Sequence, residues 1–244
     1  MRLMWLLFAF SGPVLWAAST HIDKYLVDRY FKDSDTAVLI VFTALIGIAM
    51  LPFIWFFRPG VLALSGTNIA VMVASGVLFM GAMLFYLRAI QSEEASVVAP
   101  LFQTSVLFTF LLAYLLLGET LTASKAAGLV LIVAATLVLS FDPSLSLRRF
   151  KLRLVLLMLA CTFTLALASV IFKFYAVQDE FWATTFWMFA GEALYGVVFL
   201  SIPSYRAQFI HLLRSNGKAL LAINASNELI NLGGALANRY ALIF

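Results

Sequence analysis

Long apolar stretches separated by short polar segments divide this chain of 244 residues. A helix needs about 20 mostly apolar residues to cross the hydrocarbon core of a bilayer. The apolar stretches span residues 3–18, 36–57, 68–87, 95–117, 126–139, 152–177, 181–202 and 219–244. Because a backbone in lipid must satisfy its own hydrogen bonds, the pattern predicts an all-α polytopic membrane protein with about eight transmembrane helices.

The first stretch has a second interpretation. It follows Arg2, is short, and ends in Ala17-Ala18-Ser19, which is also the pattern of a cleaved signal peptide. Residues 19–35 are then expected to be a polar segment. The internal repeat described below favours a retained helix.

A polar elbow joins two apolar stretches in the middle of the chain. Residues 95–117 lead into Gly118-Glu119-Thr120-Leu121-Thr122, and residues 126–139 follow. The stretch begins with Glu94-Ala95-Ser96, and a Gly-Leu-Val-Leu-Ile-Val run lies after the threonine-bearing turn. This membrane hairpin resembles the fourth and fifth helices of EamA-type transporters in the drug/metabolite transporter superfamily. The resemblance implies a ten-helix carrier with two inverted five-helix repeats, which usually exports amino acids, metabolites or toxic amphiphiles by alternating access.

The two halves of the chain can be aligned as a repeat. A shift of 149 residues places Ala17 on Ala166, Lys24 on Lys173, Ala44 on Ala193 and Gly47 on Gly196, and a shift of 152 places Gly81 on Gly233 and Ala89 on Ala241. We therefore expect a first repeat at residues 1–141, a basic inter-repeat loop at 142–151, and a second repeat at 152–244. The second copy contains three helices and is expected to be truncated, because the equivalents of residues 93–140 are missing.

Composition supports the membrane class. The chain is 64% hydrophobic and 11% charged, with a mean hydropathy of +1.01, whereas globular domains carry about 25% charged residues. The net charge of +4 does not indicate nucleic acid, because the basic residues are mostly scattered singly between apolar stretches. Eleven Lys and Arg fall on the side of residues 148–153 and five on the side of Arg2, so the positive-inside rule predicts a cytoplasmic inter-repeat loop and an external N-terminus.

Enzymatic signatures are missing from the sequence. It contains no Walker loop, H-E-x-x-H, G-x-S-x-G or dinucleotide fingerprint, and a single cysteine, Cys161, offers no disulfide framework. We expect a protein that is not an enzyme, needs no cofactor and holds no metal. A carrier driven by an ion or solute gradient is the simplest remaining class.

The eighth stretch carries the most unusual polar pattern. At 100° per residue, five polar side chains lie within an arc of about 100° on one helix face. They are Asn224, Asn227, Glu228, Asn231 and Asn238. A carboxylate at mid-membrane costs roughly 2.5–3.5 kcal/mol, so it normally faces a cavity or a partner. Asparagines can instead simply join helices through hydrogen bonds, but a stripe that includes Glu228 favours a cavity wall.

Other candidates lie elsewhere in the chain. Glu192 is a second intramembrane carboxyl group, and either it or Glu228 can carry a proton or remain structural. Candidates from the first repeat, for which ordinary packing is the alternative, are Trp16, Ser19, Tyr86 and Gln103. Lys24 and Lys173 are expected to snorkel at helix ends, and His21 to be a loop residue beside Asp23.

Together these features predict an integral membrane secondary transporter, an exporter or permease for small metabolites, amino acids or amphiphilic compounds. Its expected location is the plasma (bacterial inner) membrane. The expected partners are a small-molecule substrate and the lipid bilayer, with proton coupling and a homodimer left open. A non-transporting membrane scaffold and a lipid-linked sugar flippase are the alternatives.

Overall fold

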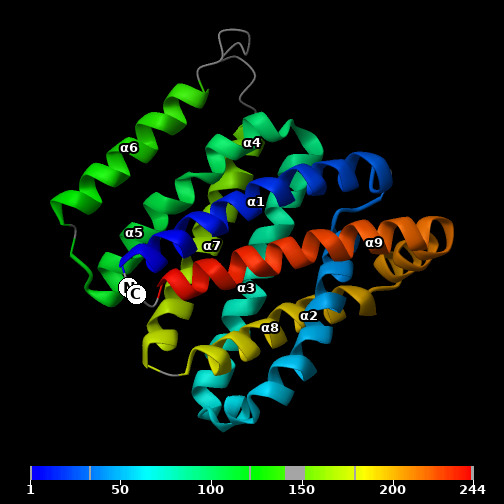
Figure 1. Cartoon of the computed structure of the whole chain (residues 1–244). Coiled ribbons are helices and arrows are strands. Elements are labelled where there is room, and N and C mark those ends of the chain that lie inside the picture. The colour runs from blue at the N-terminus through cyan, green and yellow to red at the C-terminus, as the bar shows by residue number, and fades with distance from the viewer. Residues whose placement is uncertain (1, 33, 121, 141–151, 179, 243–244) are drawn as a thin grey trace.

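The computed structural model describes residues 2–32, 34–120, 122–140, 152–178 and 180–242. Over these residues the regular structure is helical, which confirms the all-α class (Figure 1). The α-helices are α1 (Arg2–Tyr30), α2 (Ala37–Phe57), α3 (Gly66–Ser92), α4 (Ala95–Phe102), α5 (Thr104–Leu117), α6 (Ala123–Ser140), α7 (Leu152–Gln178), α8 (Phe181–Ser201) and α9 (Pro203–Leu242), with a short 3-10 helix η1 (Pro59–Ala63). The expected basic loop at 142–151 lies outside the described residues.

Several described stretches are long and apolar enough to cross a membrane. By length and composition they are Ala37–Phe57, Gly66–Ser92, Ala95–Leu117, Leu152–Ala176 and Phe181–Ser201, and Ala123–Ala135 is a shorter apolar helix. The chain is thus a multi-pass membrane protein. The total number of crossings and the inverted repeat stay predictions.

The expected polar segment after the first helix is wrong. Residues 19–30 continue α1 as helix, although they include Asp23, Lys24, Asp28 and Arg29. Hydropathy suggested an end to the helix because it counts each polar group as if it faced water. In the structure Asp23 and Lys24 bond to other helices, so the helix continues. His21 accordingly lies in α1 and not in a loop.

The expected fourth helix is divided into α4 and α5. Pro100 has no backbone N–H, and its ring crowds the preceding turn, which weakens the helix there. α4 ends at Phe102, and the Thr104 hydroxyl donates to the Leu101 carbonyl at 2.8 Å. The elbow that follows is confirmed, because Gly118 ends α5 in the left-handed conformation, with φ of 66°.

The polar segment between the last two apolar stretches, residues 203–218, is also helical. α9 begins at Pro203, and Asn216, with φ −134° and ψ 16°, separates its first segment from the second. The first segment is anchored by its apolar face, where the Phe209 ring lies 4.6 Å from that of Phe42. The backbone N–H of Asp35 donates to Gln208 at 3.0 Å, so the connection between α1 and α2 is tied to this segment.

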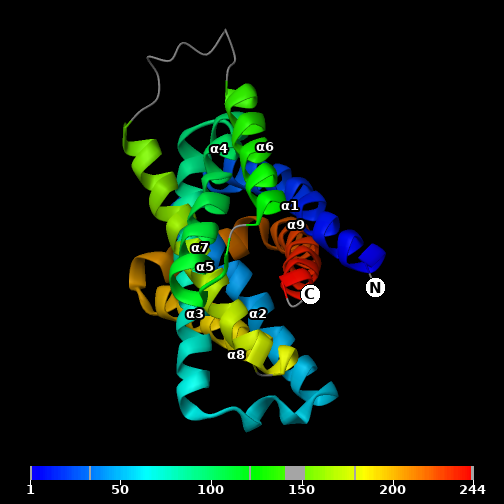
Figure 2. The same cartoon turned by 90° about the vertical axis from the view of Figure 1, so that its left-hand side faces the viewer.

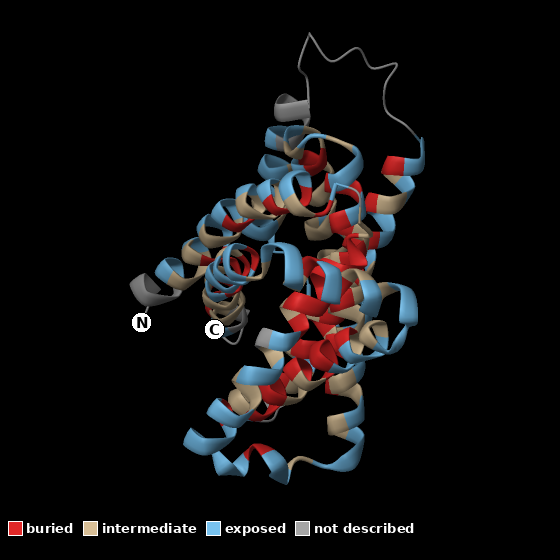
Figure 3. Cartoon of the chain, turned by 90° about the vertical axis from the view of Figure 1, so that its right-hand side faces the viewer, coloured by how far each residue is buried: buried red, intermediate tan, exposed pale blue. Residues whose placement is uncertain are grey.

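The helices pack in pairs. α1 lies along α9, α2 crosses α8, α3 contacts both α7 and α8, and α5 covers part of α7. Figures 1 and 2 show α1 and α9 side by side, with the beginning of one near the end of the other. Buried residues concentrate where the central helices cross, whereas the outer turns are exposed (Figure 3). The α1–α9 pair therefore forms one wall of the bundle.

Small residues allow two crossings to be very close. A methyl group added at Gly76 of α3 would overlap the backbone of α8 at Met188, and one added at Gly191 of α8 would overlap α3 at Val73. At the α2–α8 crossing, a methyl group on Gly196 would overlap Ala44. Such backbone approaches are typical of membrane helices, whose association depends on close packing because lipid supplies no hydrophobic driving force between them.

Candidate functional site

The polar stripe of α9 faces the interior of the bundle. Asn224, Asn227 and Glu228 are 1%, 0% and 9% exposed, whereas Leu221 and Leu229 on the same helix are 44% and 61% exposed. This is the orientation that the 100° periodicity predicts. The amides and the carboxyl group therefore meet other helices, not lipid.

The α1 helix supplies a carboxyl group to this stripe. The Asn227 side-chain nitrogen donates to the Asp23 carboxylate at 2.7 Å, joining α9 to α1. Asp23 was not among the predicted site residues, because the residues around it resembled a loop. One signal was available: Ser19 and Asp23 are four residues apart and share a helix face.

The Glu228 carboxyl group has partners on two helices. The Thr43 hydroxyl of α2 contacts it within hydrogen-bond distance and also lies 3.4 Å from the Leu39 carbonyl. Asn231, one turn further along α9, bonds to Glu228 as well. Glu228 thus lies at the junction of α2 and α9, held by donors that suit a carboxylate.

A third acid approaches from α8. Glu192 is 8% exposed and interacts electrostatically with Glu228, as does Asp23. Three acidic side chains from α1, α8 and α9 therefore occupy one region of the interior. We call Asp23, Asn227 and Glu228, together with Glu192, Asn224 and Ser19, the acid–amide cluster.

The structure places the other predicted contributors at different distances from the cluster. Tyr86 of α3 lies beside Thr20 and interacts with Asp23, so the structure places it against the cluster. Trp16 lies where α1 and α9 are close, because a methyl group added at Gly234 would be 2.9 Å from the indole nitrogen. Gln103 is exposed at the break between α4 and α5 and lies outside the cluster.

The neighbouring lysine does not neutralise the cluster. The Lys24 ammonium donates to the Ile90 carbonyl at 3.0 Å and to the Glu93 carbonyl at 3.4 Å, and it pairs with Asp28 at 3.1 Å. It therefore fastens α1 to the end of α3, where we expected it to reach the membrane surface. None of the ion pairs in the described part of the chain involves Asp23 or Glu228.

Several buried oxygens of the cluster lack donors. Asn224 Oδ1, Asn227 Oδ1 and Ser19 Oγ have no hydrogen-bond partner. A buried polar atom without a partner is destabilising by about 1–3 kcal/mol, so these oxygens need a partner from outside the chain, such as an ordered water molecule or a bound solute. In the described part of the chain, no three His, Cys, Asp or Glu side chains are close enough together to hold a metal ion. The arrangement can take up protons or bind a molecule that donates hydrogen bonds.

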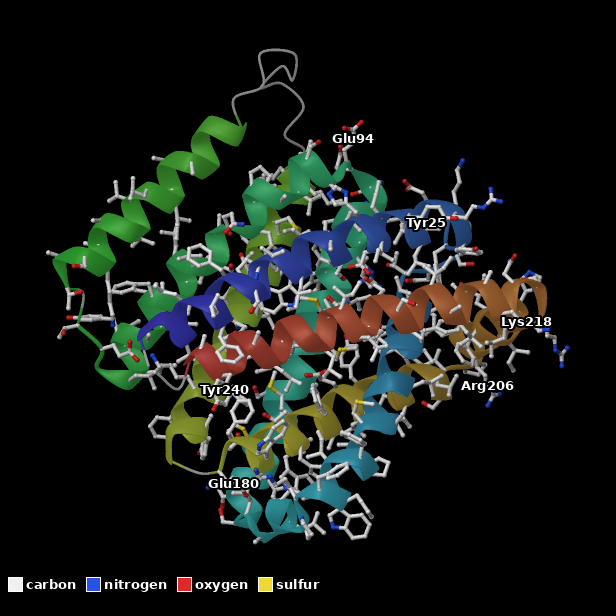
Figure 4. All side chains as sticks on the ribbon, in the orientation of Figure 1. Tyr25, Glu94, Glu180, Arg206, Lys218 and Tyr240 are labelled. Carbon is white, nitrogen blue, oxygen red and sulfur yellow. The ribbon has the colours of Figure 1, made fainter. Side chains whose placement is uncertain are left out.

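Two crevices flank the α1–α9 pair. One, of about 440 Å³, is lined by His21, Ile22, Tyr25, Ala222, Ile223 and Ser226. The other, of about 370 Å³, is lined by Phe8, Ser11, Leu15, Phe181, Trp182, Gly233, Leu236, Ala237 and Tyr240. Figure 4 shows Tyr25 and Tyr240 near opposite ends of the pair. Both crevices are mainly apolar, and the residues that line them do not belong to the acid–amide cluster.

The elbow carries a separate group of charges. Lys173 of α7 and Lys125 of α6 both pair with Glu119, the first through a short ion pair and the second at 3.5 Å. The hydrogen bond from Lys173 holds the pKa of the Glu119 carboxyl group below its ordinary value. Lys173 therefore tethers the elbow to α7 and does not simply extend to the membrane surface.

Comparison with known proteins agrees with these features. The model of the EamA-like transporter family matches residues 3–141, more than half of the chain. A search of curated proteins gave no match. The matched region contains α1 to α6, including Asp23, the α5–α6 elbow and Thr43. This multi-pass membrane protein, with a polar cluster buried between its helices, belongs to the EamA-like transporter family.

Proposed function

We propose that the protein is a secondary transporter that moves small solutes across a plasma (bacterial inner) membrane, with the acid–amide cluster as its binding and coupling site. One observation carries the proposal: a transporter-family chain buries Glu228 and Glu192, with Asp23 beside them, between membrane helices. Ionisable groups in a membrane are costly and usually mark substrate or proton pathways. Export by alternating access is the mode we propose.

The packing of the helices supports the inverted repeat on which alternating access would depend. Under the aligned register, α1 and α9 are equivalent to α7 and α3, and both pairs are in contact. The correspondence extends to single atoms. Cys161 Sγ donates to the Ala82 carbonyl at 3.2 Å, and a methyl group at the equivalent Gly12 would lie 3.3 Å from the carbonyl of Gly234, the equivalent of Ala82.

A difference between equivalent positions supports movement of one repeat against the other. A methyl group on Gly196 would overlap Ala44, but one on the equivalent Gly47 would have no atom within 4 Å. The α2–α8 crossing is therefore tight at one of two equivalent points only. In the proposed cycle the close contact at Gly196 opens while an equivalent close contact forms at Gly47. This change exposes the cluster first to one side of the membrane and then to the other.

The experiment is transport in proteoliposomes with the Glu228→Gln variant. Glutamine keeps the shape and hydrogen bonds of the side chain but fixes its neutral state. With a trapped pH dye and a panel of amino acids, amines and amphiphilic drugs, we expect wild-type protein to exchange protons for a solute. We expect the variant to lose uphill transport while retaining exchange of the solute itself.

The control is Glu94→Gln, because Glu94 is exposed at the beginning of α4 and points away from the bundle (Figure 4). It should transport as wild type does. An unchanged rate and pH profile in Glu228→Gln would remove Glu228 from the site. Wild-type protein that moves none of the solutes, but binds other membrane proteins or moves lipid-linked sugars, would favour the scaffold or the flippase.

A further inference from the structure

The first segment of α9 presents a row of basic side chains at one end of the bundle. At 100° per residue, Arg206, Ile210 and Arg214 lie within an arc of about 80° on one helix face. All three are exposed, whereas Phe209 and Leu212 on a different face of the segment are buried in the core. The segment is therefore held by its apolar side, and the arginines extend from a support that packs on the protein.

Two further basic residues lie at the same end of the bundle. Figure 4 shows Lys218 and Arg206 extending outward from this part of α9. Arg88, exposed near the end of α3, interacts electrostatically with the Tyr195 phenol of α8, which also interacts with Tyr205 of α9. α3 and α9 therefore contribute cations to one region. We call Arg88, Arg206, Arg214 and Lys218 the basic surface.

The basic surface is not neutralised by neighbouring acids. None of its four cations forms an ion pair with another residue that the structure describes. Two acids at this end of the bundle are engaged elsewhere, because Asp28 pairs with Lys24 and the Asp35 carboxylate accepts from the backbone N–H of Ala37. The basic surface is thus complementary to an anion from outside the chain.

A lipid-facing stripe on α8 leads to the basic surface. Leu194, Val197 and Val198 are about half exposed and lie within an arc of about 100° on one helix face. α8 is long and apolar enough to cross a membrane, and it ends at Ser201, just before the segment that carries Arg206. The arginines therefore begin where the apolar stripe ends, which is the level of the lipid headgroups.

We propose that the basic surface binds the headgroup of an anionic phospholipid, whose acyl chains lie along the exposed stripe of α8. Arginine binds phosphate through paired hydrogen bonds, and basic residues beside a membrane helix attract anionic lipids. The positive-inside rule predicts that this end of the bundle faces the cytoplasm, where the membrane surface is negatively charged. The site is separate from the acid–amide cluster and goes beyond the proposed transport function.

A lipid bound here stabilises more than the first segment of α9. The Gln208 side chain accepts a hydrogen bond from the Asp35 backbone N–H at 3.0 Å, and the Phe209 ring packs on Phe42 of α2. A phospholipid that fixes this segment therefore also fixes the connection between α1 and α2. Because the lipid binds the folded protein, it should raise the unfolding temperature.

The test is native mass spectrometry of the whole chain, released from detergent micelles that contain equal amounts of dioleoylphosphatidylglycerol and dioleoylphosphatidylcholine. We expect the protein to retain the anionic lipid preferentially. Arg206→Gln combined with Arg214→Gln should reduce this retention at least about tenfold, because two cations are lost. The control is Arg58→Gln, since Arg58 is exposed at the opposite end of α2, and it should retain the lipid as wild type does.

Thermal unfolding in detergent provides a second measurement. Added phosphatidylglycerol should raise the Tm of wild type and of Arg58→Gln but not that of the double variant. Glycerol 3-phosphate, which carries a phosphate without acyl chains, should leave every Tm unchanged. Equal retention of the two lipids, or unchanged retention in a folded double variant, overturns the inference. An equal rise in Tm with glycerol 3-phosphate would assign the basic surface to a soluble phosphate compound and overturn it as well.

Discussion

Replacing Gly76 by alanine should loosen the crossing of α3 and α8. The added methyl group would overlap the Met188 carbonyl, and the nearest other atoms belong to the α8 backbone at Gly191 and Glu192. Because backbone cannot rotate away as a side chain can, the helices must separate. Overpacking of this kind costs about 1–3 kcal/mol. The gain in helix propensity of about 1 kcal/mol from Gly to Ala offsets part of it.

Gly128→Ala is the matched control. Gly128 lies in α6, and a methyl group there would have no atom within 4 Å, so the control reports the propensity gain alone. Relative to Gly128→Ala, Gly76→Ala should destabilise by the whole overpacking term of about 1–3 kcal/mol. For a chain of this size, 1 kcal/mol changes Tm by about 2–4 °C.

The assay is thermal unfolding in detergent, followed by the reactivity of Cys161 with a thiol-specific fluorophore. Cys161 is completely buried, and its thiol donates to the Ala82 carbonyl of α3, so it becomes reactive when α3 and α7 separate. We expect Gly76→Ala to unfold about 2–12 °C below Gly128→Ala. Equal unfolding temperatures would refute the close approach of α3 and α8.

Three further predictions concern movement, pH and orientation. In a background without the native cysteine, Gly47→Cys and Ala193→Cys should cross-link only during turnover, and equal cross-linking of the resting protein would contradict the proposed exchange. The pKa of Glu119 is lowered in the folded protein, so its ion pair with Lys173 should stabilise the elbow above the ordinary value of 4.5 and be lost as the pH falls through the folded value. Proteolysis at the elbow should therefore increase at acid pH in wild type but not in Lys173→Met, and an equal increase would assign the effect elsewhere. Ser144→Cys should stay unlabelled by a membrane-impermeant thiol reagent on intact cells if the inter-repeat loop is cytoplasmic, and strong labelling would reverse the orientation.

Features that depend on a single helix could be predicted from the sequence. The stripe of Asn224, Asn227 and Glu228 follows from 100° periodicity, and the structure turns it inward. The elbow was predictable from Gly118, because glycine readily adopts the left-handed conformation that ends a helix. Both are local, because every residue needed for the argument lies within a few turns of the others.

Features that depend on partners from distant helices were not predictable. Asp23 resembled a loop residue until its partner Asn227 was known, 204 positions away. The same holds for Lys24, whose acceptors are carbonyl groups near the end of α3. The stretch Ala95–Leu117 was predicted correctly as a candidate membrane span, and its division at Gln103 was foreseeable from Pro100. The helical first segment of α9 was foreseeable from the spacing of Phe209 and Leu212.

The aligned halves also explain why polar groups gather on one side of the bundle. In the aligned register Asp23 is equivalent to Phe172, and Asn227 to Ser75. Phe172 packs in an apolar cluster with Met72, and Ser75 donates to the α7 backbone at 3.0 Å, so the α3–α7 contact is satisfied without a ligand. The α1–α9 contact leaves buried oxygens unpaired. Substitutions between α3 and α7 should therefore affect mainly folding, and those between α1 and α9 mainly binding and transport, because the proposed binding site lies at the second contact.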